Sequence, residues 1–187
     1  MSSTEWVLTP WDNLVLGVNC YEISNPTSAQ LTYAASNPGH YTVRIDPLAS
    51  KFELQEKGFY YCDTLIEPYV TPDRLRPFDS NLAQVQPNPP LEAILKIAQN
   101  AFLHGRFHRD FNVLSSHAER RYVNWLIQLH GENEVYGLYF EGYLIGFIAT
   151  KQNCLALHAI DADHRGKGIA KYLWTKMCQK LFEGGIK

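Results

Sequence analysis

The sequence predicts an α/β (α+β) protein with two domains joined by a proline-rich linker. Apolar residues recur at helical spacing in three stretches, and shorter apolar runs between them are typical of strands. Six of the ten prolines fall within residues 68–90. Because such a density excludes a continuous helix or a central strand, residues 70–88 are predicted to form a surface linker. It would separate an N-terminal domain, residues 1–69, from a C-terminal domain, residues 89–187.

The N-terminal domain is predicted to be a small α/β domain. HYTVRID (residues 40–46) is typical of a strand. KFELQEK (residues 51–57) is typical of a short helix ended by Gly58, and FYYCDTLIEPY (residues 59–69) of a second strand.

Two helices are predicted to open the C-terminal domain. The first has its apolar positions between Leu91 and Phe102, and the second begins at Ser115 or Ser116 and ends near Gly131. HGRFHRDFNV, between them, has no period and is predicted to be a loop. The stripe expected to be buried on the second helix is Ala118, Tyr122, Trp125, Leu126 and Leu129.

Three strands and a final helix are predicted after these two helices. Residues 134–150 are typical of two strands around a hairpin turn at Glu141 and Gly142. CLALHAIDA (residues 154–162) is typical of a further strand. Apolar positions from Ile169 to Leu181 then predict the final helix.

The segment RGKGIA, at the junction between the last strand and the last helix, is the clearest functional signal. Gly166 and Gly168 let the backbone take unusual dihedral angles and approach a ligand closely. The free N–H groups at a helix start favour an anion such as a diphosphate. The spacing fits neither the Walker motif nor G-x-G-x-x-G. From the glycines alone, a plain turn and a phosphate cradle both remain open.

This segment resembles the R-x-x-G-x-[GA] motif of the GCN5-related N-acetyltransferases, with Arg165, Gly168 and Ala170 at its defining positions. The resemblance covers residues 89–187 and implies a GNAT-like acyl-CoA N-acyltransferase fold with acetyl-CoA (coenzyme A) as cofactor. It implies that the backbone of one strand segment pairs with the pantetheine arm, and that the following loop and helix start bind the diphosphate. The cofactor-binding residues so implied are His158, Ala159, Ile160, Arg165, Gly166, Lys167, Gly168, Ile169, Ala170 and Lys171.

A finer resemblance is to the dTDP-fucosamine acetyltransferases, which acetylate an amino sugar carried on a nucleotide. It rests on Trp11-Asp12, Gly17-Val18-Asn19, the proline-rich segment, and Ala101-Phe102 followed by Arg106-Phe107. In the family the loop between the first two helices borders the acceptor. Arg106, His108 and Asp110 are therefore candidate substrate-binding residues, with a solvated polar loop as the alternative.

The resemblance also implies that the C-terminal part of the fold is missing, because the family's domain continues with a fifth strand, a helix and a closing hairpin. The fold would be truncated after the helix that follows the fourth strand, and residues 154–160 would form an edge strand that a homodimer could cover. Two functions follow: an N-acetyltransferase acting on a small primary amine, with an amino-sugar nucleotide as one candidate, or a non-catalytic acyl-CoA-binding or interaction module. No catalytic acid or base is identified, and His158 is expected to be structural.

The composition limits the classes of partner that this chain is expected to bind. A formal net charge of −2 argues against a nucleic-acid partner, and no apolar run approaches the roughly 20 residues that cross a bilayer. The four cysteines lie far apart without C-x-x-C spacing, and no metal site is predicted. Scattered thiols and an N-terminus without signal-peptide features lead us to expect a cytoplasmic protein.

Overall fold

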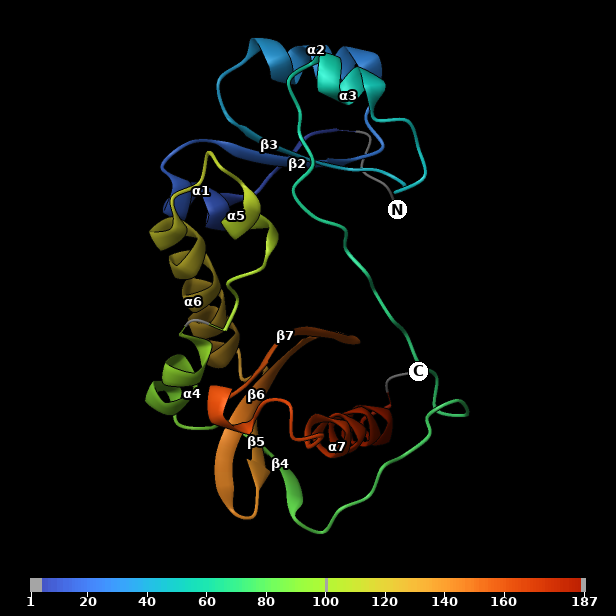
Figure 1. Ribbon diagram of the computed structural model, residues 1–187, viewed down its shortest axis with the longest axis vertical. Helices are drawn as coiled ribbons and strands as arrows, with labels where there is room; N and C mark the ends of the chain where they lie inside the picture. Colours follow the sequence, from blue (N-terminus) through green and yellow to red (C-terminus); the bar gives the residue numbers. More distant parts are fainter. Residues whose placement is uncertain (1–4, 100, 186–187) are drawn as a thin grey trace. The chain divides into compact units, whose positions relative to one another are not determined.

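The computed structural model describes residues 5–99 and 101–185 (Figure 1). The chain forms two compact units. The N-terminal unit comprises Met1–Leu65 with His104–Arg121, and the C-terminal unit comprises Ile66–Leu103 with Tyr122–Lys187. Both contain helices and a sheet, so the mixed α/β class is confirmed.

The N-terminal unit is built on a three-stranded sheet in the order β1-β2-β3. Strand β1 (Val7–Leu8) is antiparallel to β2 (Cys20–Ser24), and β2 is parallel to β3 (His40–Arg44). Helix α2 (Ser28–Ser36) connects the two parallel strands and starts with a complete capping box between Thr27 and Gln30. The buried apolar residues of this unit include Val15, Cys20, Ile23, Leu31, Ala34 and Phe107.

Three short helices complete the N-terminal unit. They are α1 (Pro10–Leu16), α3 (Phe52–Glu56) and α5 (Arg106–Arg109). The predicted strand at residues 40–46 is confirmed as β3, and the predicted short helix is confirmed as α3. The strand predicted at residues 59–69 is wrong. Its side chains are mostly exposed at both odd and even positions, so no buried face selects a strand there.

The C-terminal unit is built on a four-stranded antiparallel sheet in the order β4-β5-β6-β7. The strands are β4 (Ala83–Pro87), β5 (Val135–Phe140), β6 (Tyr143–Lys151) and β7 (Cys154–Ile160). One face packs against α4 (Leu91–Ala98) and the later turns of α6 (Ser115–Gly131), and the other against α7 (Ala170–Glu183) (Figure 1). A 3-10 turn, η1 (Ala162–His164), lies between β7 and α7.

The predicted order of helix, helix, three strands and helix is confirmed, with α5 as an extra single turn in the predicted loop. The hairpin turn is confirmed, with φ of 52° at Glu141 and 83° at Gly142. The predicted linker, residues 70–88, contains β4 at its end. Proline did not prevent this strand because Pro87 is its last residue and β4 lies at the edge of the sheet.

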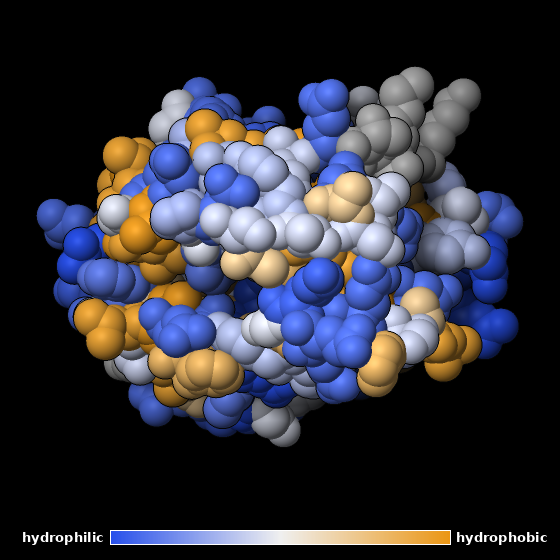
Figure 2. Space-filling view, turned by 90° about the horizontal axis from the view of Figure 1, so that it is seen from above, coloured by the Kyte–Doolittle hydropathy of each residue, from blue (hydrophilic) through white to orange (hydrophobic). Residues whose placement is uncertain are grey.

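The surface in Figure 2 shows hydrophobic side chains in several separate areas between hydrophilic ones. Exposed apolar residues occur in both units. Among the described residues, no helix has the combination of length and apolarity that crossing a bilayer requires.

Candidate functional site

The turn from β7 into α7 is shaped by two glycines. Gly166 and Gly168 have φ of 74° and 71°, in the left-handed region that residues with a Cβ rarely adopt. A Cβ added at either glycine would meet no atom within 4 Å, so the backbone here is open to a ligand. Arg165 closes the turn, because its Nε donates a hydrogen bond of 2.7 Å to the carbonyl oxygen of Ile160.

The start of α7 is free of side-chain capping. Its N-cap residue is Ile169, no side chain in the described part of the chain caps it, and the first turn carries no acidic residue. The first amides of a helix have no partner within the helix. Together with the helix dipole and the side chains of Lys167 and Lys171, they make this end of α7 suitable for an anion.

Strand β7 brings the predicted pantetheine-binding backbone to the edge of the sheet. In the described residues it pairs with β6 alone, so its second edge is open. The register shifts near Ala156, which is an extra residue relative to β6. Near the end of β7 the two strands lie unusually close: a Cβ on Gly146 would be 2.6 Å from the carbonyl oxygen of Ala159.

His158 lies on the face of β7 that meets α7. Its ring packs edge-on against Trp174, with the ring centroids 4.6 Å apart. Loss of hydration against this neighbour lowers the pKa of His158 below its ordinary value of 6.5. The residue is otherwise exposed to solvent, and the contact with Trp174 is consistent with the structural role expected of it.

The chain was compared with models of known protein families. The model of the acetyltransferase (GNAT) family matches residues 92–187, about half of the chain. The chain belongs to the GNAT family. Searches against curated proteins and against solved structures found no match.

The family match covers the turn between β7 and α7. Members are acetyltransferases and generally use acetyl-CoA. The matched range contains every residue predicted to bind the cofactor, from His158 to Lys171. In the structure these residues form one continuous strand, turn and helix start within the C-terminal unit.

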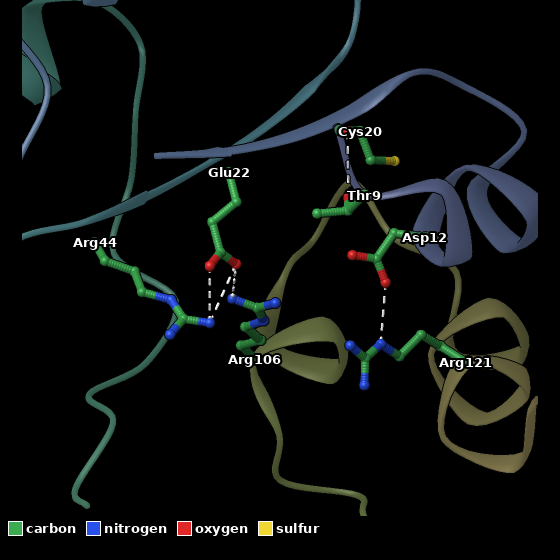
Figure 3. Close-up of polar contacts among 7 residues, drawn as sticks. All are labelled: Thr9, Asp12, Cys20, Glu22, Arg44, Arg106 and Arg121. Carbon is green, nitrogen blue, oxygen red and sulfur yellow. Dashed lines mark hydrogen bonds and ion pairs between the residues drawn. The ribbon is translucent and has the colours of Figure 1, made fainter. Parts of the chain in front are cut away.

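The residues predicted to bind the acceptor lie in the N-terminal unit, in or next to α5. Arg106 and Arg44 converge on Glu22, with N–O distances of 3.3 Å and 3.0 Å (Figure 3). Two guanidinium groups on one carboxylate leave this cluster with one excess positive charge. His108 is partly buried on the same short helix.

The Phe107 ring anchors α5 in the N-terminal unit. It is buried, with the guanidinium groups of Arg106 and Arg121 over it at 4.8 Å and 5.0 Å from its centroid. Arg121 also donates a hydrogen bond of 3.0 Å to Asp12 of α1 (Figure 3).

Asp110 is surrounded by donors and is only 6% exposed. It accepts hydrogen bonds from the Tyr60 hydroxyl at 2.5 Å and the Asn112 N–H at 2.8 Å, and it pairs with His40 Nε2 at 3.0 Å. Burial alone would raise the pKa of Asp110, but these hydrogen bonds outweigh it and hold the pKa below its ordinary value. With both oxygens engaged, Asp110 orders the segment after α5.

Tyr60 is fixed in the same network. Burial, and then its hydrogen bond to Asp110, raise the pKa of Tyr60 to about 12, so the hydroxyl remains a donor.

The sequence did not predict the contacts made by Glu22, His40 and Tyr60. No local pattern could have found them, because their partners lie 22 to 84 residues away along the chain.

Proposed function

We propose that this protein is an N-acetyltransferase that transfers the acetyl group of acetyl-CoA to a primary amine. The observation that carries the proposal is the pair of open glycines, Gly166 and Gly168, ahead of the uncapped start of α7. Amides from Gly166 to Lys171 would bind the diphosphate, and the open edge of β7 would pair with the pantetheine arm.

The reaction would proceed by attack of the neutral amine on the thioester carbonyl. A carbon–nitrogen bond forms, the carbon–sulfur bond breaks, and the thiolate leaves and takes up a proton. We propose that a backbone N–H near Ile160 polarises the carbonyl oxygen. The proton that the nitrogen loses balances the proton that the thiolate takes up, so the products are an N-acetyl amide and CoA.

For the acceptor, we propose an amino sugar carried on a nucleotide. The support is the excess positive charge of Arg44 and Arg106 around Glu22, since arginine binds phosphate oxygens well. Arg106 and His108 are the proposed acceptor contacts, and Asp110 would hold their segment in place.

Isothermal titration calorimetry with CoA tests the cofactor site. Gly168→Gln and Gly168→Glu share the backbone strain of a side chain at φ 71°, and differ in the charge they bring to the diphosphate. We expect Gly168→Glu to bind CoA about 10-fold or more weakly than Gly168→Gln, which corresponds to the loss of one charge-assisted contact. Equal affinity of the two folded variants would refute the assignment.

A thiol-release assay tests catalysis and the acceptor. Acetyl-CoA is supplied with simple amines, free amino sugars and nucleotide-linked amino sugars. A preference for the nucleotide-linked acceptors that falls in Arg106→Gln would support the acceptor proposal. CoA binding without turnover on any amine would instead favour a non-catalytic acyl-CoA-binding module.

A further inference from the structure

Phe78 and Asp79, in the segment ahead of β4, both contact α7. The backbone N–H of Phe78 donates a hydrogen bond of 3.1 Å to the hydroxyl of Thr175. Thr175 is only 4% exposed, and it donates in turn to the carbonyl oxygen of Lys171 at 2.8 Å. Asp79 adds a longer ion pair with Lys176, at 3.8 Å. The position of Phe78 along α7 is therefore set by a buried side chain.

The Phe78 side chain is not buried by this attachment. It remains 51% exposed. The ammonium of Lys171 lies over its ring, 5.2 Å from the centroid, and 5.1 Å from the centroid of the Tyr172 ring. The Phe78 ring is therefore held beside Lys171 with about half of its surface available to a ligand.

The Phe78 ring lies close to a residue at the start of α7. Lys171 is in the first turn of α7, the turn whose free amides form the proposed diphosphate site. A ligand whose diphosphate binds there has its nucleoside end within reach of the surface beside that turn. In CoA this end is an adenine with a 3′-phosphate on its ribose. An exposed aromatic ring offers a stacking surface for a purine, and an ammonium beside it offers a counter-charge for a phosphate.

We propose that Phe78 stacks against the adenine of CoA and that Lys171 attracts the phosphate next to it. This inference rests on the proposed function. It adds a cofactor contact outside residues 92–187, the range that the family model matches, and thus assigns a binding role to the segment predicted as a linker. The Thr175 hydroxyl is the positioning group that holds Phe78 beside α7.

The test compares CoA with 4′-phosphopantetheine, which lacks the adenosine, by calorimetry on the full chain. Stacking of one base on an aromatic side chain is worth about 5- to 100-fold in affinity. We expect Phe78→Ala to weaken CoA binding by that factor and to leave binding of 4′-phosphopantetheine unchanged. Phe78→Trp should retain or improve CoA binding. The matched control is Tyr69→Ala, because Tyr69 is an 84% exposed aromatic residue of the same C-terminal unit, and it should change the affinity for neither ligand.

Other outcomes would overturn the proposal in distinguishable ways. Unchanged CoA affinity in Phe78→Ala would show that no adenine contact exists, while leaving the proposed function intact. An equal loss for both ligands would show that Phe78 only supports the fold of α7. Failure of the unaltered protein to bind CoA at all would refute the proposed function itself, and this inference with it.

Discussion

Asp110 is the residue whose replacement should most clearly disturb the segment after α5. It accepts hydrogen bonds from Tyr60 and the Asn112 N–H and pairs with His40, and it is almost completely buried. Replacement by alanine leaves buried donors without an acceptor. Replacement by asparagine keeps the shape but removes the charge and turns one oxygen into a donor.

The loss of stability can be estimated from the burial and the charge of Asp110. Removing one partner of a buried ionic network costs about 3–5 kcal/mol, and a single hydrogen bond to a charged group contributes about 1.5–3 kcal/mol. We expect Asp110→Ala to lower the free energy of unfolding of the N-terminal unit by about 3–5 kcal/mol, and Asp110→Asn by about 2 kcal/mol. The matched control is Asp63→Asn. Asp63 pairs with Arg109 at 3.3 Å on the surface, so its loss should cost less than about 1 kcal/mol.

The loss of stability caused by Asp110→Asn should depend on pH. The pKa of Asp110 is lower in the folded than in the unfolded state, so its stabilising contribution is fully present above the ordinary value of 3.8. The contribution is lost as the pH falls through the folded pKa. The difference between Asp110→Asn and the unaltered protein should therefore be largest near neutral pH and should shrink as the pH falls below 3.8.

Urea unfolding followed by far-UV circular dichroism measures the change in stability at each pH. Hydrogen exchange read by mass spectrometry on residues 104–121 assigns it to the N-terminal unit. If Asp110→Asn were no more destabilising than Asp63→Asn at neutral pH, the hydrogen bonds to Asp110 would not be stabilising and the reasoning would be wrong.

Three further predictions concern the C-terminal unit. Gly146→Ala should destabilise the protein by about 1–3 kcal/mol in urea unfolding, because the new Cβ would clash with the carbonyl oxygen of Ala159. Thr175→Val keeps the shape but leaves the Phe78 N–H without its acceptor, and should cost about 1–3 kcal/mol in the same measurement. The imidazole of His158 should titrate by NMR with a midpoint below 6.5, and a midpoint at or above that value would contradict its desolvation.

Apart from the single turns α5 and η1, the elements of residues 89–187 were predictable because each has a local signature. Helix α6 carries an apolar stripe and ends at Gly131, and the turn between β5 and β6 has glycine where a positive φ is required. The turn before α7 was predictable for the same reason, since Gly166 and Gly168 take the conformation that their residue type suggests. Such features depend on neighbours within a few positions, which the sequence displays directly.

Strand β4 and the polar contacts around α5 were not predictable in this way. Residues 83–86 do alternate, with Ala83 and Val85 less exposed than Gln84 and Gln86, but the run is short and is flanked by prolines, and it becomes a strand because β5 offers it a pairing edge. The roles of Glu22 and Tyr60 depend on partners brought close by the fold, at Arg106 and Asp110. Long-range pairs of this kind leave no period or motif along the chain.

The segment His104–Arg121 belongs to the N-terminal unit, although it lies between two segments of the C-terminal unit along the chain. The sequence suggested that residues 89–187 form one domain, whereas His104–Arg121 pack with the N-terminal half. Phe107 is 3% exposed there, and the charged groups that neutralise Arg106 and Arg121 are Glu22 and Asp12. Without the N-terminal half, these arginines would lose both carboxylates. Asp110 would lose Tyr60 and His40 as well, leaving one backbone donor. The ion pairs of Arg106, Arg109 and Arg121 with Glu22, Asp63 and Asp12 join this segment to the N-terminal half, so that half is a structural part of any acceptor site built on Arg106.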